Sequence, residues 1–183
     1  MWDPFEQTLK TFGHENLIQA NPEAVEKLKI PERSKKFMTE IGLPKENILL
    51  CEFDLNLDEF PTVQEYARRC GSHIEIDLHL KRIGWDGGTQ ICLDESQHTG
   101  EVITIDIEGK LPTRFVNSNI ETFSGFLSLF VADYCRFSNG TDKELDKKAF
   151  KLDLLFRELD PPAFNSQDTW WSCIAQQMKE GLL

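Results

Sequence analysis

Hydrophobic and polar residues alternate regularly over the middle of the chain. From residue 72 to residue 80 every second side chain is aliphatic, which is the period of a strand with one buried face and one wet face. Ile91 and Leu93 follow a glycine-containing turn, and a polar turn then leads to a second alternation from residue 102 to residue 107. We therefore predict neighbouring antiparallel strands in this part of the chain.

Two short helices are predicted before these strands. Asn21 followed by Pro22 is typical of a helix N-cap and first position, and the helix must stop before Pro31. A second helix begins at Pro31 and ends at Gly42, which supplies a C-terminal stop before Pro44. These helices predict a helical N-terminal cap.

A longer helix is predicted after the strands. Residues 118–121, Ser-Asn-Ile-Glu, match a capping box, and apolar residues follow at helical spacing from Phe123 to Tyr134. Residues 140–148 are read as a charged, mobile insert, after which Phe150, Leu154 and Leu155 indicate a return to packed structure.

One further strand and one further helix complete the predicted architecture. Residues 48–54 predict a first strand, followed by an acidic loop. After Pro162 a last helix places Trp171 on its apolar stripe, whereas Trp170 is left between edge packing and contact with a partner. The order of helices, antiparallel strands and helices predicts an α+β fold with a central antiparallel sheet flanked by helices.

Length and composition favour one folded domain spanning residues 1–183. Hydrophobic residues make up 40% of the chain, which is too rich for a disordered acidic tail. The five cysteines are scattered and form no C-x-x-C pair, so we read them as small buried hydrophobes in a reducing compartment. The first residues lack the pattern of a signal peptide, and the sequence predicts a soluble, cytoplasmic protein.

The charge is strongly negative. Twenty basic and thirty-one acidic side chains give a net charge of −11, and thirteen of the acidic residues but only four basic ones lie between Glu52 and Glu108. Direct binding to nucleic acid or to an anionic membrane is therefore disfavoured. Two interpretations stay open: a solvated, solubilising face, or a docking surface for a basic protein.

Candidate chemistry is sparse. The histidines in His73-x-Glu75-x-Asp77-x-His79 lie roughly 20 Å apart on a strand, too far for one metal ion to bind both. The adjacent carboxylates of Asp94 and Glu95 show no sign of the burial that acid–base catalysis needs. The glycines of residues 84–88 lack the Lys and Ser/Thr of a phosphate loop. We predict no metal, no cofactor and no catalytic residue.

Several short motifs occur in a fixed order over most of the chain. They are Ile41-Gly42-Leu43-Pro44, Leu80-x-x-Ile83-Gly84, Ile91-x-Leu93-Asp94, Thr99-Gly100-Glu101-Val102, Phe115-Val116-Asn117-Ser118, and Trp171 followed by Ile174 and Gly181. Their order and spacing resemble the SUKH superfamily of bacterial immunity proteins, most closely its fourth group. The positions read as structural are Gly42, Pro44, Gly84, Gly100, Asn117, Ser118 and Trp171.

The resemblance implies a cytoplasmic antitoxin without enzymatic activity. Members look like antidotes encoded beside polymorphic toxins, many of them nucleases or nucleic-acid deaminases, which they neutralise by stoichiometric binding. A toxin that grips nucleic acid needs a basic surface, so an acidic partner associates with it quickly. The candidate contact residues for such a basic toxin domain are Glu52, Asp54, Asp58, Glu59, Asp86, Asp94 and Glu95.

Two other functions are kept as alternatives. One is a regulatory or scaffolding module of the same fold that binds an endogenous protein, with no toxin involved. The other is a hydrolase or metal-dependent enzyme, for which a tightly bound ion or a perturbed buried carboxylate would be the sign. The sequence does not fix the oligomeric state.

Overall fold

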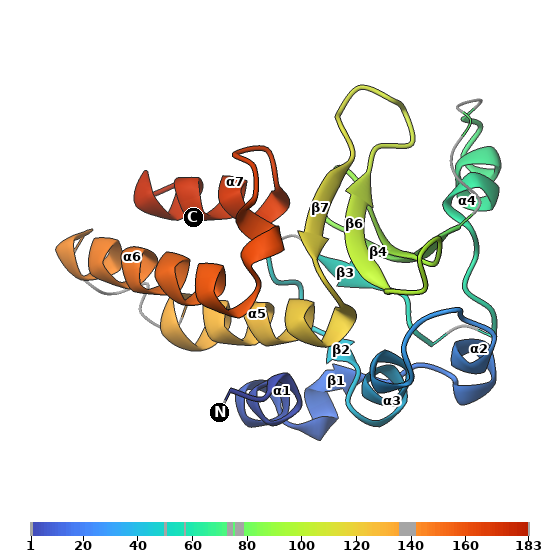
Figure 1. The fold of residues 1–183 in the computed structure, drawn as a ribbon, viewed down its shortest axis with the longest axis horizontal. Coiled ribbons are helices and arrows are strands. Elements are labelled where there is room, and N and C mark those ends of the chain that lie inside the picture. The colour runs from blue at the N-terminus through green and yellow to red at the C-terminus, as the bar shows by residue number, and fades with distance from the viewer. Residues whose placement is uncertain are drawn as a thin grey trace.

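The predicted α+β architecture is confirmed by the computed structural model, which describes residues 2–49, 51–56, 58–72, 75, 79–135 and 142–182. An antiparallel sheet with the strand order β3-β4-β5-β6-β7 stands beside the helices (Figure 1). Its strands are β3 (Glu52–Phe53), β4 (Leu80–Trp85), β5 (Gln90–Asp94), β6 (Glu101–Ile105) and β7 (Arg114–Asn117).

The helices lie around this sheet in three groups (Figure 1). The N-terminal group is α1 (Pro4–Phe12), α2 (Pro22–Glu26) and α3 (Glu32–Glu40), tied by the small sheet of β1 (Leu17–Ile18) and β2 (Leu43–Pro44). Helix α4 (Val63–Arg69) packs near the β4 edge. The third group is α5 (Ile120–Asp133), α6 (Asp142–Leu159) and α7 (Trp170–Lys179), with the 3₁₀ helix η3 (Pro161–Phe164) before α7.

Helix α5 is the centre of the core, because its residues from Ile120 to Phe130 are all buried. Phe126 stacks on Phe156 of α6 with ring centroids 4.2 Å apart, and it meets Trp171 of α7 edge-on at 5.3 Å. Trp2, just before α1, lies on the other side of Phe126, and a Cβ at Gly125 would come within 2.5 Å of its ring. Close packing of large aromatic side chains therefore joins α1, α5, α6 and α7.

The predicted short helices are confirmed as α2 and α3, and the last helix as α7. The capping box at the start of α5 was wrong: the N-cap is Asn119, whose side chain accepts from the Thr122 N–H. Ser118 and Glu121 are engaged elsewhere, since the Ser118 hydroxyl donates to Asp160 and the Glu121 carboxylate accepts from Ser34.

The predicted strands are correct in type but not in extent. Residues 48–54 contribute only the two residues of β3, because an Ile48–Cys51 bridge and a positive φ of 53° at Leu49 form a tight turn before it. Strand β4 begins at Leu80, and most of the alternation from 73 to 78 falls outside the described residues. Strand β6 ends at Ile105, where the alternation gives way to a turn.

The charged insert was wrong for its C-terminal part, because residues 142–148 belong to α6. Phe150 and Leu154 do not return to the core, because they are 59% and 53% exposed, whereas Leu155 is partly buried against it as predicted. The buried apolar positions of this helix include Leu152 and Phe156. The cysteines also differ from expectation, since Cys51 and Cys92 are buried whereas Cys70 and Cys135 are exposed.

A buried carboxylate connects the sheet to the C-terminal helices. Asp160, 3% exposed, accepts hydrogen bonds from the Asn117 amide at 2.8 Å, the Ser118 hydroxyl at 2.6 Å and the Ser118 N–H at 2.9 Å. Asn117 in turn accepts from the Trp171 indole N–H at 2.7 Å. Every strong polar group of this network has a partner, which is the condition under which a buried network stabilises a fold.

Removal of the Asp160 carboxylate should be strongly destabilising. Asp160→Ala leaves the buried Asn117 amide and the Ser118 donors without an acceptor, which should lower the free energy of unfolding by about 3 kcal/mol. The control is Asp168→Ala, an exposed aspartate before α7, which should change it by less than about 0.5 kcal/mol. Equal effects in chemical denaturation would contradict the role given to the network.

Protonation of Asp106 should make the free energy of unfolding depend on pH. Its carboxylate accepts hydrogen bonds from the backbone N–H groups of Glu108, Leu111 and Lys110. These hydrogen bonds lower the pKa of Asp106, and their effect outweighs that of burial, which raises the pKa. A lowered folded pKa means that the stabilisation is complete above about pH 4 and is lost as pH falls through the folded pKa. The difference in free energy of unfolding between wild type and Asp106→Asn should therefore shrink on acidification. A difference that grows towards acid pH would refute this assignment.

Candidate protein-binding surface

The seven predicted contact residues do not lie on one surface. Strand β4 runs between two ends of the sheet, with Trp85 paired to Gln90 at one end and Leu80 paired to Asp94 at the other. These ends are about 17 Å apart at the usual strand rise. Asp86 lies at the first end, and Asp94 and Glu95 lie at the second.

Asp86 is half-buried, and both of its carboxylate oxygens accept hydrogen bonds from the protein. One carboxylate oxygen accepts from the N–H and the hydroxyl of Thr89, at 2.7 and 2.8 Å. The other accepts from the indole N–H of Trp170 at 2.8 Å. Trp170 itself is only 6% exposed, so the structure favours the packing interpretation of this tryptophan over the contact interpretation.

The two acidic residues at the other end are also engaged. Glu95 is 6% exposed and accepts from the backbone N–H of Lys29 at 2.8 Å, which joins the β5–β6 turn to the N-terminal helices. Asp94 is half-buried and accepts from the Ser96 N–H at 2.7 Å, which shapes the same turn. Glu95 is therefore hidden from a partner, whereas Asp94 stays partly accessible.

The other four residues are exposed and close together in the sequence. Glu52 belongs to the edge strand β3 and Asp54 follows it, whereas Asp58 and Glu59 lie in the next loop, where Asp58 accepts from the Asn21 amide at 3.3 Å. Residues 46–59, here called the acidic segment, contain five acidic residues and neither Lys nor Arg. Glu46 was missed as a candidate, although the absence of basic residues from this run was a visible signal.

The acidic segment is fixed to the sheet. Asp54 forms an ion pair with Arg82, whose side chain is 8% exposed and also stacks on the Tyr66 ring at 4.2 Å. Glu52 accepts from the Trp85 indole at 3.0 Å. Leu55 between them is fully buried. The described part of the segment is thus tied to the sheet at Glu52 and Asp54.

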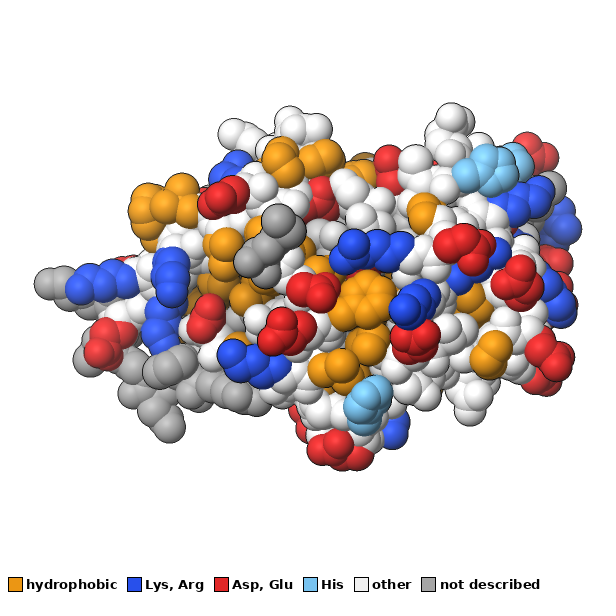
Figure 2. All heavy atoms as spheres, turned by 60° about the horizontal axis from the view of Figure 1, so that its bottom comes forward, with side chains coloured by type: hydrophobic (Ala, Val, Ile, Leu, Met, Phe, Trp, Pro, Cys, Tyr) orange, Lys and Arg blue, Asp and Glu red, His pale blue; other side chains and the backbone are white. Residues whose placement is uncertain are grey.

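Charge is mixed on another face of the molecule. Figure 2 shows the face that lies at the bottom of Figure 1, where acidic and basic side chains are interspersed and hydrophobic side chains lie between them. Helix α3, at the bottom of Figure 1, carries such mixed charge, for example in the ion pair of Lys36 with Glu40. The acidic excess is therefore not concentrated on this face.

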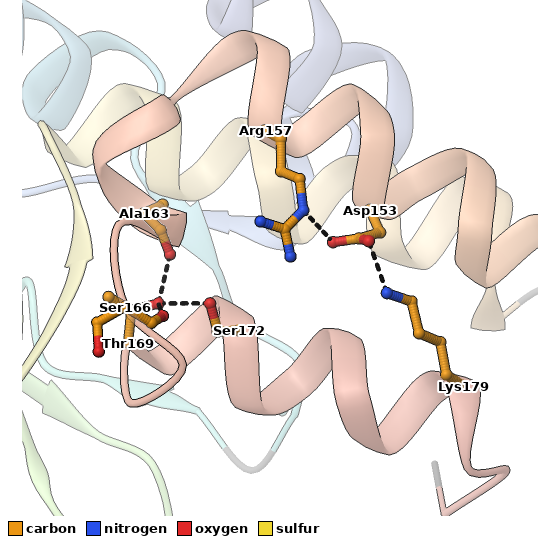
Figure 3. Close-up of polar contacts among 7 residues, drawn as sticks. All are labelled: Asp153, Arg157, Ala163, Ser166, Thr169, Ser172 and Lys179. Carbon is orange, nitrogen blue, oxygen red and sulfur yellow. Dashed lines mark hydrogen bonds and ion pairs between the residues drawn. The ribbon is translucent and has the colours of Figure 1, made fainter.

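A groove of about 840 Å³ lies between α6 and α7. Asp153, whose side chain is 6% exposed, pairs there with Arg157 at 2.9 Å and with Lys179 at 2.6 Å (Figure 3). The hydroxyl of Thr169 joins the Ala163 carbonyl to Ser172 at the start of α7. The single carboxylate of Asp153 lies between two cations, so it joins α6 to α7 and leaves one net positive charge beside the groove. The lining of the groove is otherwise mainly amide and hydroxyl groups, together with the exposed carboxylate of Asp168.

Among the described residues one half-buried carboxylate, Glu101, has a raised pKa, because of burial and the charges of Asp94 and Asp160. The described residues offer no comparable sign of a metal site. They contain no group of three or more His, Cys, Asp or Glu placed to hold a metal ion, and His73 and Asp77 fall outside them. Burial raises the pKa of the Cys51 and Cys92 thiols, which keeps both protonated and poorly nucleophilic. No described helix combines the length and apolar character that a membrane crossing requires.

The seven positions read as structural all lie at close contacts. Gly42 has a φ of +87°, and a Cβ there would lie 2.0 Å from the Ile18 carbonyl oxygen; at Gly84 a Cβ would lie 2.2 Å from the Glu52 carbonyl. Pro44 pairs with Leu17, and Gly100, at φ +68°, packs on Ile30. Asn117, Ser118 and Trp171 belong to the network around Asp160.

Together the fold and the surface define an α+β protein whose ordered sheet edge presents carboxylates. The model of the SUKH-4 immunity protein family matches residues 4–177, so the chain belongs to this family, and the predicted resemblance is confirmed. Immunity proteins of this family are generally non-enzymatic and imply a toxin as the partner. Searches of the curated proteins and of the solved structures gave no match.

Mutation should distinguish acidic residues that stabilise the fold through hydrogen bonds from acidic residues that are only exposed. Asp86→Ala leaves the Trp170 indole and Thr89 without their acceptor and should lower the free energy of unfolding by about 2 kcal/mol. Glu59→Ala removes an exposed carboxylate and should change it by less than about 0.5 kcal/mol. Urea denaturation of both variants checks this, and a tolerant Asp86 would return that residue to the set of surface candidates.

Proposed function

We propose that this protein binds a cognate bacterial toxin in the cytoplasm and neutralises it by stoichiometric contact, with the acidic segment as its main docking surface. The observation that carries this proposal is the family match together with five exposed carboxylates in one short segment. The toxin is a basic protein domain of the nuclease or nucleic-acid deaminase type, from a polymorphic toxin system. No direct contact of the immunity protein with nucleic acid or membrane is part of this mechanism.

Electrostatics supports a basic toxin. An enzyme that acts on nucleic acid carries cationic side chains around its active site, because it must bind phosphates. A chain with a net charge of −11 attracts such a surface and accelerates the encounter. Bound at the mouth of the active site, the acidic segment would take the place of the substrate backbone.

The attachment of the segment to the sheet also favours tight binding. Asp54 donates its N–H to the Ile83 carbonyl at 2.8 Å, and Cys51, Leu55 and Phe60 are buried beneath the segment. Little conformational entropy is then lost on association, which leaves more of the interaction energy for affinity. The exposed carboxylates need no rearrangement of the sheet to reach a partner.

Neutralisation of the segment tests this proposal. The triple variant Glu46→Gln, Asp58→Asn and Glu59→Gln should slow association with the toxin encoded beside the gene by about tenfold at low salt, and rising salt should reduce the difference. The control triple variant Glu6→Gln, Asp168→Asn and Glu180→Gln removes the same charge from other exposed sites. Stopped-flow or surface-based kinetics measures both.

The control separates local contact from net charge. A much smaller effect in the control variant supports the acidic segment as the docking surface. Equal effects in both variants would show that only net charge matters, and binding that ignores salt would remove the electrostatic basis altogether. Loss of growth protection with the first variant alone would link the surface to immunity.

A further inference from the structure

Helix α6 presents an exposed face that the proposed toxin contact does not use. Its buried side is formed by Ala149, Leu152 and Phe156. At 3.6 residues per turn, the opposite side carries the set of exposed residues called here the α6 face. These residues are Lys147, Phe150, Lys151, Leu154 and Glu158.

Two large apolar side chains lie in the middle of this face. Phe150 and Leu154 are 59% and 53% exposed and stand one helical turn apart, so they form a continuous apolar stripe. The other large hydrophobic side chains exposed in the described residues, Leu111 and Leu182, lie in a loop and near the C-terminus. A contiguous apolar stripe on a regular helix is typical of an interaction surface.

The charge of α6 differs from that of the rest of the chain. Residues 142–159 contain five acidic and five basic residues, so the helix is neutral while the whole chain carries −11. Surfaces rich in carboxylates, such as the acidic segment, would repel a second copy of themselves. A neutral helix such as α6 removes this local repulsion, which favours a second copy of the same chain as the occupant of this face.

The order of charges along the face is self-complementary. Lys147 and Lys151 are like charges at i and i+4, and neither they nor Glu158 have a hydrogen-bond or ion-pair partner among the described residues. Glu158 is about 16 Å from Lys147 along the helix, too far to pair within one copy. A partner helix in the opposite direction brings the two charges level.

We propose that the protein forms a two-fold symmetric dimer in which α6 packs antiparallel against α6 of a second copy. With the axis level with residues 152 and 153, Lys147 of each copy lies beside Glu158 of the other. Leu154 then meets the aliphatic stem of Lys151 and the ring of Phe150 from the second copy. The same patch is used twice, as a two-fold interface requires.

The dimer should be weak and reversible. One helix from each copy offers less than the about 800 Å² per partner of standard stable interfaces, so we expect a dissociation constant of roughly 10–100 µM. The acidic segment includes β3, at the edge of the sheet away from β7, whereas α7 beside α6 packs against β7. Dimerisation therefore leaves the proposed toxin contact open.

Sedimentation velocity over about 1 to 500 µM tests the proposal, because this range brackets the expected dissociation constant. Wild type should pass from monomer to dimer with rising concentration, and Leu154→Glu should stay monomeric. The matched control is Leu111→Glu, which adds the same charge to a leucine that is 50% exposed outside α6, and it should dimerise like wild type. A wild-type monomer throughout the range, or equal behaviour of the two variants, overturns the proposal.

A charge reversal tests the antiparallel register. Lys147→Glu and Glu158→Lys should each raise the dissociation constant about tenfold, and the double variant should restore it to within about threefold of wild type. Failure of the double variant to recover dimerisation would contradict the proposed pairing. All the altered positions are exposed, so we expect every variant to fold. Circular dichroism checks this.

Discussion

The buried carboxylate of Asp160 is the interaction on which the arrangement of this protein depends. It receives hydrogen bonds from the end of β7 and the start of α5, and through Asn117 it fixes the indole of Trp171. The position of α7 then places Trp170 against Asp86 in the β4–β5 turn. A chain of satisfied polar contacts therefore runs through the aromatic core, from the C-terminal helices to the sheet.

This network divides the acidic residues of the chain into two kinds. Glu95 and Asp160 are buried and Asp86 is half-buried, and each accepts hydrogen bonds that stabilise the fold. In the acidic segment, Glu52 and Asp54 also contact the sheet but stay exposed, as do the other carboxylates of the segment. Net charge alone overstates the area available for electrostatic docking, and the proposed function rests on the second kind only.

The sequence predicted the features that depend on local pattern. Asn21-Pro22 marked α2, and the apolar stripe around Trp171 marked α7, because caps and periodicity act within one turn. Helix α4 was missed although Thr62 and Glu65 form a capping box, since its short apolar pattern is weak. The role of Asp86 could not be foreseen, because its partner Trp170 lies 84 residues further along the chain. Burial of this kind is set by tertiary packing.

Hydrogen exchange of the protein alone and bound to the toxin domain encoded beside its gene shows whether the acidic segment is the docking surface. Toxin binding should slow exchange of backbone amides within residues 46–59 and in the neighbouring strand β4, at one toxin per immunity protein. Protection confined to other surfaces, with the acidic segment unchanged in the complex, would contradict that role.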